Sequence, residues 1–172
     1  MATAAADRPR IMTDAEWEAR QQLAACYRVF DMLGWSEMIY NHITLKVPGE
    51  DHAFLINPFG LHFSEVKASN LVKIDIDGNK LDDSPYPVNR AGFVQHAVFH
   101  RHLPDVHCIM PTHTTAGMAV SSLEGGLQPA NFYASNSAGQ IAYQRLEDRR
   151  AGKEGRDAGG PDHLKKKQST RQ

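Results

Sequence analysis

The stretch 104–117 sets out a turn, a short apolar run, a histidine and a helix start in close succession. Residues 106–110 are apolar apart from His107 and suit one short buried strand. His113 follows this run, and one of the two threonines after it is placed to cap a helix that continues to Ser122. The chain must therefore bring the end of a strand next to the start of a helix. Several α/β folds deliver a metal ligand from such a strand end.

A capped helix and a series of short strands precede this stretch. Thr13 and Glu16 have the spacing of a capping box, apolar residues then recur at helical spacing, and Gly34 is placed to end the helix. Strand patterns follow at Ile43–Val47, Ala53–Asn57 and Val72–Ile76, and Ser64–Leu71 suits one or two helical turns. The first two strands flank a Pro-Gly turn and predict a hairpin.

The second half of the pattern alternates helices with extended segments. A helix is predicted over Ala91–His102, closed by the proline at position 104. After the helix that runs to Ser122, two glycines mark a break, and Leu127–Ser135 is predicted to be a last extended segment. The mixture of helices and short strands predicts an α/β domain.

Composition changes sharply near the C-terminus. Residues 1–144 hold 10 basic and 15 acidic side chains, whereas 145–172 hold 9 basic and 5 acidic ones. We predict a disordered leader at 1–12, one domain over 13–144 and a charged disordered tail at 145–172. The tail has no aromatic residues for base stacking, which argues against nucleic acid as a partner. Cys26 and Cys108 are expected to be free thiols, and the lack of a long apolar run predicts a cytoplasmic protein without a membrane span.

Four stretches resemble the class II aldolase/adducin family, and in particular its adducin-like bacterial branch. These stretches are Tyr40–Thr44, Leu55–Gly60, Ala91–His102 and Cys108–Ser122. The likeness covers about residues 13–143, so the resemblance implies a family domain that is incomplete at its C-terminus. It also implies a three-layer α/β/α sandwich with a mainly antiparallel central sheet. Enzymatic members are homotetramers, which implies a homo-oligomer here or a hetero-oligomer with a full-length relative.

The family's chemistry implies a metal site that this chain matches only in part. Zinc or another divalent cation, held by three histidines, stabilises an enediolate as a Lewis acid. His113 matches the second histidine of a His-x-His pair, but Pro111 stands at the first position and the later histidine has no counterpart. The position of the acid–base glutamate falls on Gly92. The resemblance therefore implies a domain without a competent metal site and without a catalytic residue.

The family's phosphate-binding positions also map onto this chain. The first phosphate loop corresponds to Asn41 and His42, the second ends at Gly60, and a phosphate-binding serine falls on Arg90. Together with Asn57, these residues are the candidates for a polar substrate pocket, in which backbone amides near a glycine receive an anion. Two ordinary turns are the alternative interpretation.

Other histidines offer a weaker route to a metal site. His96 and His100 are four residues apart on the predicted helix and so share one face. We expect one of them to pack against the sheet and the other to face solvent, because a pair also needs a third donor. His107 is expected to be exposed.

Two functions stay open at this point. The first is a degenerate family member that acts as a binding or oligomerisation module, with a small-molecule ligand possible and an actin-type partner by analogy with adducin. The alternative is a zinc-dependent aldolase, lyase or epimerase acting on a hydroxy-carbonyl compound or sugar phosphate. In that case His113 would be one ligand, and His107, His96 or a neighbouring subunit would supply others.

Overall fold

The computed structural model describes residues 12–143. The predicted tail, and the predicted leader apart from Met12, lie outside the described residues. The chain forms two compact units, the first ending at Thr112 and the second beginning at His113.

Helix α1 (Asp14–Met32) has the caps that the sequence predicts. The Thr13 hydroxyl accepts a hydrogen bond from the Glu16 amide at 3.0 Å. At the other end Gly34 has a φ of 72°, and the Trp35 amide donates to the Phe30 carbonyl at 2.8 Å. This Schellman ending satisfies carbonyls that the last helical turn leaves open. The second half of the predicted capping box is replaced, because both carboxylate oxygens of Glu16 bind basic side chains.

Four short strands form one antiparallel sheet in the order β3-β2-β1-β4. The strands are β1 (Thr44–Lys46), β2 (Ala53–Ile56), β3 (Val72–Asp75) and β4 (Cys108–Ile109). The predicted hairpin is the β1–β2 pair, with Leu45 opposite Leu55. A short 3-10 helix, η1 (Phe63–Glu65), lies where one or two helical turns were predicted.

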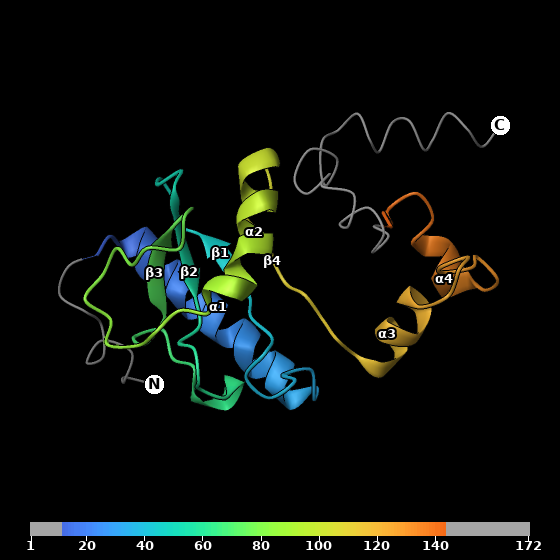
Figure 1. Cartoon of the computed structure of the whole chain (residues 1–172), viewed down its shortest axis with the longest axis horizontal. Coiled ribbons are helices and arrows are strands. Elements are labelled where there is room, and N and C mark those ends of the chain that lie inside the picture. Colours follow the sequence, from blue (N-terminus) through green and yellow to red (C-terminus); the bar gives the residue numbers. More distant parts are fainter. Residues whose placement is uncertain (1–11, 144–172) are drawn as a thin grey trace. The chain divides into compact units, whose positions relative to one another are not determined.

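Helices cover both faces of this sheet (Figure 1). Side chains alternate along β2, so Leu55 packs into the cluster formed with α1, while Phe54 and Ile56 pack into the cluster formed with α2 (Arg90–His102). The α1 cluster contains Leu23, Tyr27, Phe30, Ile43, Phe63 and Leu71, and the α2 cluster contains Val72, Ile74, Phe93 and Ala97. The predicted three-layer α/β/α arrangement around an antiparallel sheet is confirmed.

A buried ionic network joins α1 to β3. Arg20 donates to Glu16 at 2.9 Å, to the Leu71 carbonyl at 2.6 Å and to Asp82 at 3.3 Å. Lys73 binds the other oxygen of Glu16 at 3.0 Å. Because each buried charge has a partner, the attraction between the charges offsets part of their desolvation cost, and the network ties the helix to the sheet.

The second unit contains two short helices, α3 (Thr115–Ser121) and α4 (Phe132–Asn136). Helix α3 matches the prediction and is capped by Thr114. The predicted extended segment Leu127–Ser135 is wrong at its end, where α4 begins. Asn131 caps α4 by accepting from the Ala134 amide at 3.0 Å, which stabilises a turn of helix that no apolar periodicity announces. Among the described helices, none has the length and apolar character to cross a bilayer.

Candidate functional site

The strand end that leads to His113 contains no side-chain donor at position 111. Pro111 lies two residues after β4 and is half-buried, and its carbonyl accepts a hydrogen bond from the Asn41 carboxamide at 3.0 Å. His113 is exposed and is the first residue of the second unit. The peptide nitrogen of a proline has no proton and its ring has no lone pair to offer, so position 111 cannot supply a metal ligand from its side chain.

Two of the predicted pocket residues are buried and hydrogen-bonded within the fold. Besides the Pro111 carbonyl, the Asn41 side chain binds the Trp35 carbonyl at 3.2 Å and the His42 amide at 2.9 Å. Asn57 is 5% exposed, and its carboxamide oxygen is 3.0 Å from the Tyr27 hydroxyl. Both asparagines therefore tie loops to strand ends.

The Tyr27 hydroxyl is the centre of the hydrogen bonds around Asn57. It lies 2.6 Å from the Ile43 carbonyl and accepts from the amides of Ile43 at 2.8 Å and Asn57 at 3.2 Å. Burial raises the pKa of this phenol far above its ordinary value, so Tyr27 stays protonated. A protonated, fully bonded hydroxyl joins the α1 helix to the ends of β1 and β2.

The remaining pocket candidates lie at the surface. Gly60 is exposed with a φ of 98°, and a Cβ there would meet no other atom, so its turn needs glycine for conformation alone. Arg90 is exposed at the first position of α2, and its guanidinium donates to the Asp77 carbonyl at 3.4 Å. A shared substrate pocket of Asn41, His42, Asn57, Gly60 and Arg90 stays a prediction.

The α2 face of the sheet brings together His42, His96 and His100. His96 is 3% exposed and His100 is 8% exposed, so the expectation that one of them faces solvent is wrong. Both rings contact the hydroxyl of Thr44 on β1, His96 through Nδ1 at 2.8 Å and His100 through Nε2 at 2.9 Å. The reason is that the polar side chain of Thr44 on β1 points toward α2, where two imidazoles one helical turn apart can both bind its hydroxyl.

The hydrogen-bond partners assign the tautomer of each ring. His100 Nδ1 lies 3.3 Å from the Val106 carbonyl, which only accepts, so Nδ1 of His100 carries the proton. Nε2 of His100 then accepts from the Thr44 hydroxyl, and that hydroxyl accepts from Nδ1 of His96. The chain of bonds leaves Nε2 of His96 as the unprotonated nitrogen of its ring.

Burial keeps both imidazoles neutral. It lowers the pKa of His96 to about 3, with the nearby His42 and His100 adding to the effect. It lowers the pKa of His100 to about 4, although the Val106 carbonyl works in the opposite direction. A neutral relay of this kind holds two rings in fixed orientations and provides no positive charge for an anion.

His42 completes the cluster from the start of β1. Its ring stacks on that of His96 with centroids 4.2 Å apart and planes at 31°. A Cβ added at Gly92 would lie 2.7 Å from His42 Cε1. The position that matches the family glutamate thus faces an imidazole ring.

The residues of this site do not suit a three-histidine metal centre. Position 111 lacks a donor, position 92 lacks a side chain, and the two rings on α2 are bound to Thr44. Over residues 12–143, no three histidine, cysteine, aspartate or glutamate side chains are grouped as a metal site requires.

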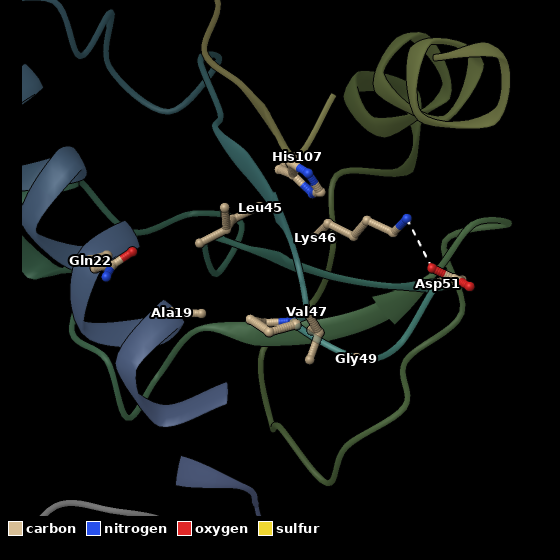
Figure 2. Close-up of a pocket in the computed structure, with 9 residues that line it drawn as sticks. Ala19, Gln22, Leu45, Lys46, Val47, Gly49, Asp51 and His107 are labelled. Carbon is tan, nitrogen blue, oxygen red and sulfur yellow. Dashed lines mark ion pairs between the residues drawn. The ribbon is translucent and has the colours of Figure 1, made fainter. Parts of the chain in front are cut away.

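Two surface pockets lie in the first unit, and neither is lined by His42, His96 or His100. A cavity of about 270 Å³ is lined by Gln22 of α1, by Lys46 of β1 and by His107, which is exposed as predicted (Figure 2). In Figure 2, Leu45 and Lys46 point to opposite sides of the strand, and Lys46 binds Asp51 at 3.1 Å. The cavity is smaller than most ligand pockets, and its polar groups do not converge.

The larger pocket, of about 670 Å³, lies over the ionic network of α1 and β3. The buried Glu16 and Arg20 already bind each other, and the half-buried Lys73 binds the other carboxylate oxygen of Glu16. The pocket is therefore the outer surface of a structural ion cluster.

Fold and site together define a class of protein: an α/β/α sandwich around an antiparallel sheet, in which Pro111 and His113 follow strand β4. Residues 21–164 match the family model for the class II aldolase and adducin N-terminal domain. The chain belongs to this family.

Relatives extend from bacteria to mammals. The chain is 43% identical over 136 residues to a provisionally named aldolase class 2 protein of Caulobacter vibrioides, covering 79% of this chain and 53% of that protein. It is 48% identical over 126 residues to alpha-adducin of Rattus norvegicus, covering 72% of this chain but 17% of alpha-adducin. The chain spans about half the length of the bacterial relatives it matches.

A solved structure supports the same assignment. The aldolase II superfamily protein of Pseudomonas syringae is 40% identical and superimposes with a TM-score of 0.76 over 81% of this chain and 59% of that one. An L-fuculose 1-phosphate aldolase of Glaciozyma antarctica is 30% identical, with a TM-score of 0.68 over 79% and 57% of the two chains.

Sequence reasoning missed Thr44 and Tyr27, the two hydroxyls around which the buried polar groups gather. The available signal was alternation: Thr44 is a polar residue within an apolar strand, on the face opposite to that of Ile43 and Leu45. A buried strand hydroxyl requires partners, and His96 and His100 of α2 are spaced to share it.

Proposed function

We propose that this domain works as a non-catalytic module that assembles with other copies of itself or with a longer relative. The observation that carries the proposal is Pro111. Where relatives with aldolase chemistry need an imidazole, this chain has a residue without a donor, whose carbonyl instead anchors Asn41 at 3.0 Å. A domain that has the family fold but lacks the first metal ligand can keep the surfaces through which family members assemble while losing the catalytic chemistry.

Exposed apolar side chains in the second unit support assembly. No residue of α3 or α4 is buried. Phe132 is 75% exposed and Tyr133 is 83% exposed, which is unusual for aromatic side chains in a folded domain. Neighbouring exposed apolar residues are Met118, Leu123, Ile141 and Tyr143. Apolar surface of this extent favours coverage by a partner.

A full-length relative is a candidate partner as well as a second copy, because both contain this family domain. Because the matched bacterial proteins are about twice as long as the matched segment, they contain a further half that this chain does not match. An actin-type partner is a weaker proposal, since the shared region makes up 17% of alpha-adducin.

Light scattering during size-exclusion chromatography tests assembly. We expect the purified chain to elute above its 19.1 kDa mass, or to co-elute with a co-expressed full-length relative. The double variant F132S/Y133S should shift the population toward monomer. Val94→Ser is the matched control, because Val94 is 64% exposed on α2 of the first unit. A wild-type chain that is monomeric and does not co-elute with the full-length relative would overturn the proposal.

A metal-dependent aldolase or lyase is the second candidate, favoured by the likeness to L-fuculose 1-phosphate aldolase. Zinc analysis of purified protein separates the two candidates. Stoichiometric zinc that is lost in His113→Ala, together with retro-aldol turnover of a sugar phosphate, would favour the enzyme. We expect neither in the wild-type chain, and we expect Pro111→His to raise zinc retention by restoring the His-x-His spacing.

A further inference from the structure

Gly92 lies in the first turn of α2, where a glycine is costly. A glycine in a helix is about 1 kcal/mol less favourable than alanine. Its backbone is helical, without the positive φ that would call for glycine. Room, rather than conformation, must therefore be the reason for a glycine at this position.

The neighbouring atoms show what needs the room. A Cβ at position 92 would lie 2.7 Å from Cε1 and 3.1 Å from Nδ1 of His42, well inside van der Waals contact. It would also lie 3.1 Å from the carboxamide nitrogen of Asn89. Asn89 caps α2 by accepting from the Gly92 amide at 3.2 Å, so moving it would open the helix end.

His42 has little freedom to move aside. Its ring stacks on His96 at 4.2 Å, and His96 is held by Thr44 at 2.8 Å. Its backbone amide donates to Asn41 at 2.9 Å, and Asn41 in turn binds the Pro111 carbonyl. A side chain at position 92 would therefore clash with the His42 imidazole, whose movement is limited by its stacking on His96.

We propose that His42 and Gly92 form a reciprocal pair, in which the imidazole of residue 42 occupies the volume that a side chain at residue 92 would need. While His42 is present, its imidazole stacks on that of His96 of α2, and the helix cannot carry a carboxylate at position 92. The inference deepens the proposed non-catalytic function, on which its functional meaning rests, because position 92 is the one that matches the acid–base glutamate of the family.

A double-mutant cycle at positions 42 and 92, followed by thermal unfolding, tests the pair. With His42 present, Gly92→Ala should lower Tm. In the His42→Gly background the same substitution should raise Tm by about 2–4 °C, because the clash with the imidazole is gone and the gain in helix propensity outweighs the tight contact with the Asn89 carboxamide. The sign of the effect should therefore reverse. His52→Gly is the control background, since His52 is exposed in the hairpin turn, and there Gly92→Ala should still lower Tm.

Two further measurements keep the test decisive if a variant folds poorly. Gly92→Glu should prevent accumulation of folded protein with His42 present and be tolerated in His42→Gly. Added imidazole at millimolar concentration should raise Tm of His42→Gly and leave the wild type unchanged. The pair is refuted if Gly92→Ala has the same effect in both backgrounds or if glutamate at 92 is tolerated beside His42. All variants are compared at one protein concentration, because assembly itself raises Tm. The reversal of sign at position 92 does not require assembly, so its failure would leave the proposed function standing, and failure of assembly would leave the pair standing.

Discussion

The two faces of the sheet are packed by different chemistry. The α1 face is a large apolar cluster built around Tyr27 and Phe63, whose rings meet edge to face at 4.6 Å. The α2 face has a smaller apolar cluster and, next to it, three histidines joined by stacking and by the Thr44 hydroxyl. The α2 face buries imidazole rings beside its smaller apolar cluster, whereas the α1 face buries the larger apolar cluster. We therefore expect the packing of α1 to contribute more to the stability of the fold than the packing of α2.

Removal of a large side chain from the α1 face should have the largest effect on stability. Phe63 is fully buried and contacts both Tyr27 and Phe30. We expect Phe63→Ala to lower the free energy of unfolding by about 3–5 kcal/mol, since it leaves a cavity among rigid rings. Urea denaturation followed by circular dichroism measures the change. A loss below about 1 kcal/mol would mean that the α1 face is not the main core.

Acid should weaken the α2 face selectively. An unfolded histidine titrates near 6.5, whereas the pKa values of His96 and His100 in the fold are about 3 and about 4. The free energy of unfolding contributed by the two neutral imidazoles is fully present above pH 6.5. It is lost as the pH falls toward 4, because the unfolded chain then binds protons that the buried imidazoles of the native chain do not bind. At pH 5 the loss should reach about 2 kcal/mol per histidine.

Chemical denaturation at pH 7.5 and pH 5 checks this sign. The drop in stability between the two values should be smaller in His96→Gln than in the wild type, and His102→Gln, at the exposed end of α2, should keep the full drop. Equal drops in all three proteins would show that carboxylates, rather than the buried imidazoles, govern the acid transition.

The Thr44 hydroxyl should contribute a smaller but specific amount. Thr44→Val keeps the shape of the side chain but leaves a nitrogen of His96 and a nitrogen of His100 without their partner. We expect a loss of about 1–3 kcal/mol in the free energy of unfolding, and recovery of most of it in Thr44→Ser. Nitrogen-15 spectra should show that both rings lose their single tautomer in the valine variant. Retention of both tautomers would contradict the relay.

The contrast between the two faces also separates what the sequence reveals from what it conceals. Caps and alternation predict α1, the hairpin and α2, because these signals lie within a few residues of one another. The spacing of His96 and His100 likewise places them on one helical face. That this face points inward depends on Thr44, which is 52 residues away from His96, and local patterns do not report such a contact.

The same reasoning applies to the candidate site. The absence of a donor at position 111 and of a side chain at position 92 can be read directly from the sequence. That the space beside Gly92 is filled by His42 cannot, because the two residues come from different elements and meet only after α2 has docked on the sheet. Asn41 shows the opposite case: a polar residue that matches a phosphate loop is bonded to backbone groups at 3.2 Å and 3.0 Å.

Substitutions on the exposed side of α2 should change the free energy of unfolding least. They test whether only the inner side of α2 packs on the sheet. Val94 is 64% exposed, whereas Ala97, three residues later, is 8% exposed and packs against the sheet. Val94→Ser should change the free energy of unfolding by less than about 0.5 kcal/mol. Ala97→Ser places a hydroxyl beside Phe54 and Phe93 and should cost about 1–3 kcal/mol if that hydroxyl finds no partner. If the two substitutions cost the same, α2 does not pack through one stripe, and the assignment of the histidine cluster to a buried face fails with it.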